Sequence, residues 1–210
     1  MGLLDMFRPR PPIGDMPALA AFIDENAAFL TQKGIYEYSR ARAGHYAKVL
    51  FSESGFKEAV ENARWRAYPL GLAMVAELVE GVLRSHGGAE RQAVLDALAA
   101  MVLAVFDRYA VPAALSGADW RDCRNELERR LGLIGIHAVK PAKDIPVPFA
   151  EAYLGLMPID RKLRASEFPT IRNYLRVTLC NIHEEFSNRA DAPVLATMLS
   201  SPREIRAQGG

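Results

Sequence analysis

The spacing of apolar side chains is the strongest signal in this sequence. Apolar residues recur every three or four positions along almost the whole chain, and strand-like alternation extends over no useful length. A period of three to four residues places apolar groups on one side of a helix. The sequence therefore predicts an all-α protein, a single-domain irregular bundle of about seven to nine helices. We expect this domain over residues 15–200, after a flexible N-terminal segment at 1–14 and before a frayed tail at 201–210.

Helix caps and helix breakers divide the N-terminal half into elements. A first helix is expected over 15–33, where Gly34 suits a C-terminal cap, and a second helix over 35–51. Pro69 either starts a new helix or kinks a long one, because proline cannot donate the backbone hydrogen bond that continues a helix; a break near Tyr68 is the favoured alternative. The fourth helix, 69–85, is apolar nearly all round, which predicts a position at the centre of the fold.

The C-terminal half adds a second central helix and one irregular connection. The helix at 89–110 follows a tight turn, so it is expected to form a central antiparallel hydrophobic hairpin with the helix at 69–85. Three prolines close together predict an extended connection at 136–148, the only candidate domain boundary. Further helices are expected over about 117–134, 148–157 and 169–187, and after Asp191.

Composition narrows the class of protein. Half of the 210 residues are hydrophobic, 24% are charged and the net charge is +1, which is ordinary for a globular protein and argues against a nucleic-acid binder. Cys123 and Cys180 form no metal or redox motif, so we expect reduced thiols in the cytoplasm. No secretory signal is recognisable, and Glu77, Glu80 and Asp96 interrupt the longest apolar runs, so no spanning helix is expected.

The common catalytic and cofactor motifs are missing from the sequence. There is no glycine-rich phosphate loop after a strand, and no GxSxG motif of the kind that carries the nucleophile of many esterases. None of the histidines follows a glutamate by three residues, the spacing used by carboxylate-bridged metal bundles. We therefore expect neither a metal site nor a cofactor. The histidines are His45, His86, His137 and His183.

The helix at 35–51 carries the best candidate for a site. Tyr38, Arg42 and His45 share one stripe, whose two ends are apolar, so its polar middle is expected to be buried. A buried guanidinium needs a charged partner. We expect Arg42 to pair with Glu77 of the apolar helix at 69–85. A second stripe of the same helix is expected to face solvent, and it consists of Glu37, Arg40, Ala41, Gly44 and Lys48.

Three interpretations of the first stripe are open. It forms a structural ion pair, or a pocket for a ligand or anion, or a catalytic pair in which His45 is a general base oriented by Glu77. Arg64 and Tyr68, from the end of the helix that comes before 69–85, would complete the cluster. The candidate ligand-binding residues are Tyr38, Arg42, His45, Arg64, Tyr68 and Glu77.

The amino terminus offers a second hypothesis. Leu3, Leu4 and Phe7 precede Arg8, an apolar tip with a basic collar that is typical of a weak membrane-surface contact. The alternative is that these side chains pack onto the body or fray. Gly2 lacks the Ser or Thr at position 6 that an acylation signal needs.

The stretches "QKGIYEYSRARAGHYAKVLF" and "RWRAYPLGLAMVAELVEGVLR" resemble an uncharacterised family of bacterial all-helical proteins, some of which carry an automatic esterase label. The resemblance implies a helical fold and no site residues. The function we expect is a non-enzymatic binding or scaffold protein of the bacterial cytoplasm, peripheral to the inner membrane if the amino terminus binds it. Its partner would be a small molecule, a protein or a second copy in a homodimer. The alternative is a small, esterase-like hydrolase.

Overall fold

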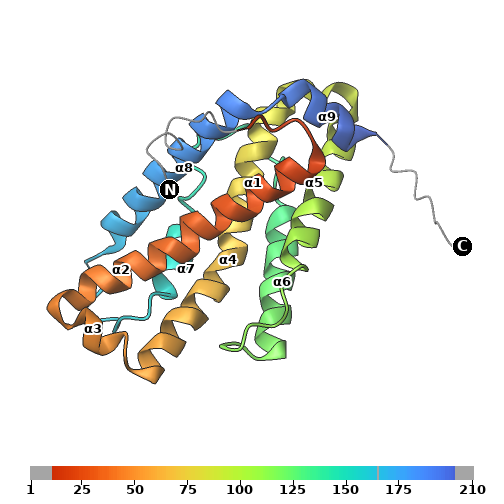
Figure 1. The fold of residues 1–210 in the computed structure, drawn as a ribbon. Coiled ribbons are helices and arrows are strands. Elements are labelled where there is room, and N and C mark those ends of the chain that lie inside the picture. The colour runs from red at the N-terminus through yellow and green to blue at the C-terminus, as the bar shows by residue number, and fades with distance from the viewer. Residues whose placement is uncertain (1–10, 165, 202–210) are drawn as a thin grey trace, which may run out of the picture.

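The protein is a bundle of helices (Figure 1). The computed structural model describes residues 11–164 and 166–201, and this part contains no β-strand, which confirms the all-α prediction. None of its helices is long and apolar enough to cross a membrane. The α-helices are α1 (Met16–Ala28), α2 (Gly34–Ala43), α3 (Ala47–Leu50), α4 (Ser54–Leu83), α5 (Arg91–Phe106), α6 (Gly117–Leu131), α7 (Ala150–Gly155), α8 (Phe168–Arg189) and α9 (Ala192–Ser200).

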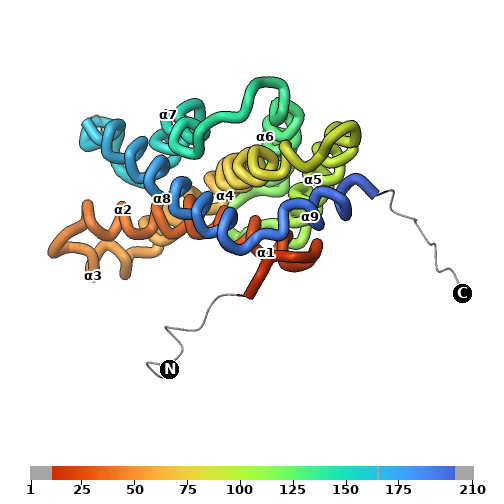
Figure 2. The backbone as a smooth tube through the Cα atoms, turned by 90° about the horizontal axis from the view of Figure 1, so that it is seen from above, coloured from red at the N-terminus to blue at the C-terminus, as the bar shows by residue number. Residues whose placement is uncertain are grey.

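Helix α4 runs through the middle of the bundle in both views (Figures 1 and 2). It is one helix of 30 residues, so the predicted break beside Pro69 is wrong. Pro69 removes one backbone donor, yet the residues on both sides of it are buried, and their packing keeps the helix continuous. α4 contacts α1, α2, α5, α6, α8 and α9. α4 is thus the central helix of the bundle, and α5, which the chain reaches through two short 3₁₀ turns, packs against it.

Helices α1 and α2 form one rod rather than two separate helices. They are joined by a π-helical segment, Phe29–Lys33, in which an extra residue is accommodated without ending the helix. The predicted cap at Gly34 is wrong, because Gly34 has the helical φ of −58°. Glycine is required there for space. A Cβ atom would lie 2.6 Å from the hydroxyl of Tyr153 and 2.6 Å from the ring of Tyr174.

Two tyrosine hydroxyls satisfy carbonyl groups of the π-helical segment. Tyr153 donates to the carbonyl oxygen of Thr31 at 2.8 Å, and Tyr174 donates to that of Leu30 at 3.2 Å. A π insertion interrupts the regular α-helical ladder, and buried carbonyl groups need a donor. Burial raises the pKa of Tyr153, so its hydroxyl keeps the proton that it donates. α7 and α8 therefore fasten the rod at its midpoint.

The rod approaches α4 closely at Gly71. A Cβ atom at Gly71 would lie 2.6 Å from the carbonyl oxygen of Ala27 and 2.9 Å from the methyl carbon of Thr31. The Thr31 hydroxyl donates to the same Ala27 oxygen at 2.8 Å. Only a residue without a side chain allows the two backbones to pass at this point.

Two irregular segments differ from the sequence-based expectation. Ile13, assigned to the flexible N-terminal segment, is buried and pairs with the backbone at the end of α8. Its N–H donates to the carbonyl oxygen of Arg189, and its own carbonyl oxygen accepts from the backbone N–H of Asp191. The connection at 136–148 is not extended. It consists largely of turns, such as the one in which Asp144 N–H donates to the carbonyl of Pro141 at 2.8 Å.

We predict that Gly71→Ala destabilises the fold by about 1–3 kcal/mol, because the added methyl group overlaps a backbone oxygen that cannot move freely. Gly55→Ala is the matched control. Gly55 lies in the same helix with nothing within 4 Å of its Cβ position, so alanine should stabilise by about 0.5–1 kcal/mol. Urea unfolding measures both. A Gly71→Ala protein as stable as the Gly55→Ala protein would contradict the close approach.

Candidate functional site

The far end of the α1–α2 rod protrudes from the bundle. After α2 the chain passes through a 3₁₀ turn, Gly44–Tyr46, into the one-turn helix α3 and back toward α4. Gly44 has the positive φ of 52°, which lets the chain reverse there. None of the residues of the turn or of α3 is buried. We call residues 44–50 the tip, and it lies at one end of the molecule in both views (Figures 1 and 2).

A groove of about 880 Å³ opens between α2 and the returning chain. Its aromatic wall is formed by Tyr36 and Phe51, whose rings meet edge to face with centroids 5.2 Å apart. Phe56 extends this wall, at 5.1 Å from Phe51. The polar side chains that line the groove are Glu37, Arg40, His45 and Lys48.

The two cations of the groove are exposed and unpaired, a state that they share with other described cations such as Lys57 and Arg121. Arg40 and Lys48 take part in no ion pair within the part of the chain that the structure describes, and Glu37 is the only acidic residue lining the groove. Elsewhere in the bundle, many arginines are paired; Arg66 with Asp119 is an example at 2.6 Å. Unpaired cations beside an aromatic wall fit a ligand that joins an anionic group to an apolar body.

The groove is made by the stripe that the sequence assigned to solvent. Helical spacing placed Glu37 and Arg40 on one face of α2, whereas Lys48 reaches the groove from α3. It could not show that the chain reverses at Gly44 and brings Phe51 back against that face. Of the predicted site residues, only His45 lines the groove.

The predicted pair between Arg42 and Glu77 is wrong. Arg42 instead forms an ion pair with Glu167 at 3.2 Å and donates to the carbonyl oxygen of Leu163 at 3.0 Å, and its side chain is 40% exposed. Glu77 accepts from Lys140 at 2.7 Å. The spacing of residues along a helix shows which of them share a face, and does not show which neighbour that face meets.

Tyr38 lies near Arg42 and Glu167, but it has no hydrogen-bond partner. Its hydroxyl oxygen is buried and unbonded. Burial raises the pKa of Tyr38 most, and the negative charge of Glu167 raises it further. Tyr38 and Arg42 therefore belong to the contact between α2 and the segment that precedes α8, not to the groove.

The remaining candidate residues, Arg64 and Tyr68, contact other side chains. Arg64 forms an ion pair with Glu61, its neighbour one turn away. The hydroxyl of Tyr68 donates to Asp24 at 2.6 Å, and Tyr109 donates to the same carboxylate at 2.9 Å. Burial and the bond to Asp24 raise the pKa of Tyr68 far above its usual value. The cluster predicted from the sequence is thus distributed over several separate contacts.

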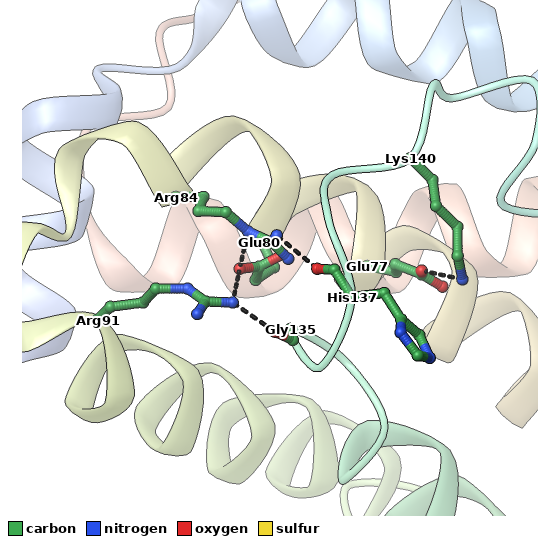
Figure 3. Close-up of polar contacts among 7 residues, drawn as sticks. All are labelled: Glu77, Glu80, Arg84, Arg91, Gly135, His137 and Lys140. Atoms are coloured by element: carbon green, nitrogen blue, oxygen red, sulfur yellow. Dashed lines mark hydrogen bonds and ion pairs between the residues drawn. The ribbon is translucent and has the colours of Figure 1, made fainter.

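A buried carboxylate on α4 organises a second polar cluster (Figure 3). Glu80 is only 3% exposed and accepts from Arg84 twice, at 2.7 and 2.6 Å, while Arg91 lies 3.6 Å away. The two arginines also reach the chain after α6: Arg84 donates to the carbonyl of His137 at 2.7 Å, and Arg91 donates to that of Gly135 at 2.5 Å. Each of these charges is already paired, so the Glu80 cluster acts as a structural clasp.

The remaining sequence-based hypotheses concern membrane contact, metals and family. Leu3, Leu4, Phe7 and Arg8, the proposed membrane contacts, lie outside the described residues. Within the described ranges, no group of three or more His, Cys, Asp or Glu side chains could hold a metal ion.

Comparison of the chain with protein-family models, curated proteins and solved structures found no match. The resemblance noted in the sequence therefore stays a prediction.

We predict that Glu80→Gln destabilises the protein by about 1–3 kcal/mol, because the buried carboxylate that accepts two bonds from the partly exposed Arg84 is lost. Asp107→Asn is the matched control: Asp107 also binds an arginine twice, at 2.8 and 3.0 Å, but its side chain is 45% exposed. That exposed pair should contribute about 0–1 kcal/mol. Equal losses for the two variants in urea unfolding would contradict the structural role of the clasp.

Proposed function

We propose that this chain is a non-enzymatic helical binding protein of the bacterial cytoplasm and that its ligand site is the groove between α2 and α3. The observation that supports the proposal is the meeting of an aromatic wall with unpaired Arg40 and Lys48 in a groove of about 880 Å³. Ligand sites are typically concave, partly aromatic and equipped with a few convergent polar groups. The ligand class is an anion attached to an apolar or aromatic body.

Binding is favoured over the alternative of an esterase-like hydrolase. The hydrolase hypothesis required Glu77 to orient His45 as a general base. Glu77 instead pairs with Lys140, beside the Glu80 clasp, and the acid that shares the groove with His45 is Glu37. In the binding proposal His45 is a ligand contact beside the two cations.

The exposure of the groove sets the expected strength of binding. Its charged side chains are solvated, and interactions between exposed charges are weakened by salt. Specificity for an anion would therefore depend on Arg40 and Lys48 together, while the aromatic wall supplies the apolar contact. The proposal thus implies modest affinity that falls as the ionic strength rises.

The probe 1-anilinonaphthalene-8-sulfonate tests the proposal, since it joins a sulfonate to aromatic rings and fluoresces when bound. We predict that the double variant Arg40→Gln/Lys48→Gln binds it about tenfold more weakly, equivalent to about 1.4 kcal/mol. Arg121→Gln/Lys143→Gln is the control, because it removes the same charge from exposed positions outside the groove. The control should leave the affinity unchanged.

A neutral analogue of the probe, without its sulfonate, distinguishes the contribution of the charge to binding from that of the apolar contact. It should bind the parent protein weakly and be insensitive to Arg40→Gln/Lys48→Gln. If the groove variant and the control variant bind the sulfonate probe equally well, the groove is not the anion site and the proposed function is wrong.

A further inference from the structure

The tip exposes apolar side chains as well as cations. Tyr46 is 73% exposed and Val49 is 56% exposed, and neither of them lines the groove. Both stand in a part of the chain that contains no buried residue. Single apolar residues on a protein surface need no explanation, but these two are close in sequence to Lys48, which has no ion pair among the described residues.

Basic residues outnumber acidic residues in the segment that includes the tip. Residues 33–51 contain four lysine or arginine residues and a single acidic residue, whereas the whole chain has a net charge of only +1. Arg42 is paired with Glu167, which leaves Lys33, Arg40 and Lys48 without a carboxylate partner among the described residues; only Arg40 and Lys48 line the groove. Such a surface attracts anions and is repelled by other cations.

We propose that the tip docks on an anionic lipid bilayer, with Tyr46 and Val49 entering the headgroup region and the groove cations contacting lipid phosphates. This inference rests on the proposed function, because it identifies the amphipathic anion of the groove as an anionic phospholipid. Tyrosine suits the interface, since its ring is apolar and its hydroxyl stays hydrated. Basic side chains near an anionic bilayer add electrostatic attraction that salt weakens.

The shape of the tip favours a lipid surface over an acidic protein segment. A helical partner needs an apolar groove several turns long, and an added strand needs an open sheet edge. Here the chain reverses at Gly44, α3 is a single turn, and the described residues contain no sheet. A short protruding turn with separated apolar side chains is suited to shallow insertion instead.

Co-sedimentation of the full-length chain with vesicles tests this inference. We predict sedimentation with vesicles of phosphatidylcholine and phosphatidylglycerol at about 0.1 M salt, and little with pure phosphatidylcholine. Arg40→Gln/Lys48→Gln should reduce the bound fraction about tenfold. Tyr46→Ser/Val49→Ser should reduce it several-fold while leaving the affinity for the sulfonate probe unchanged, because these side chains lie outside the groove.

Two control variants locate the contact. Val111→Ser/Val177→Ser removes two apolar side chains that are 50% and 52% exposed away from the tip, and it should bind vesicles like the parent chain. Leu3→Ser/Leu4→Ser/Phe7→Ser removes the three apolar residues that the sequence proposed as membrane contacts, and binding should likewise persist. Binding that is lost in the Leu3/Leu4/Phe7 variant but kept in the Tyr46/Val49 variant would assign the contact to the amino terminus and overturn the proposal for the tip.

The remaining outcomes separate this inference from the proposed function. If anionic vesicles do not sediment the chain although the sulfonate probe still depends on Arg40 and Lys48, only the lipid proposal fails. If the probe no longer depends on those residues either, both proposals fail. Binding to soluble polyglutamate without binding to vesicles would indicate an acidic protein partner. Complete release from vesicles by soluble glycerol phosphate would show that the apolar side chains play no part, and would also overturn the lipid proposal.

Discussion

The close packing of the α1–α2 rod against α4 is the constraint on which the rest of the structure depends. At Gly71 the two backbones approach so closely that a Cβ atom would lie 2.6 Å from a carbonyl oxygen. A few residues further along the rod, Tyr153 and Tyr174 hold the π-helical segment from the other side. The rod is thus held at two neighbouring points along its length. Its far end can then protrude without support from the core.

The two polar regions of the molecule use charge in opposite ways. Around Glu80, a buried carboxylate and two arginines satisfy one another and bind two backbone carbonyls, so the cluster stabilises the contact between α4 and the chain after α6. Around the groove, Arg40 and Lys48 form no ion pair with any described residue, although paired arginines are common elsewhere. The cluster around Glu80 stabilises the fold. The groove leaves free binding capacity, which is why we place the ligand there.

Much of the fold could be predicted from the sequence, and its exceptions have physical causes. The period of apolar residues was sufficient for the all-α class and for most helices, including α6 and α8. Pro69 and Gly34 misled, because local preferences for breaking a helix are weaker than the burial of its flanks and the space needed by Tyr153 and Tyr174. A π-helical segment has no recognisable sequence signal of this kind, since tertiary contacts stabilise it.

The site was harder to predict than the fold, for a reason that Arg42 illustrates. Its stripe was expected to be buried against Glu77, yet Arg42 meets Glu167, more than a hundred residues away in the sequence. The neighbouring stripe was expected to face only solvent, and it became the wall of a groove because Gly44 reverses the chain. Periodicity fixes the relative phase of side chains on one helix. Which side chain each residue contacts depends on the path of the chain between helices. A binding site depends on those contacts, and on which charged side chains are left without one.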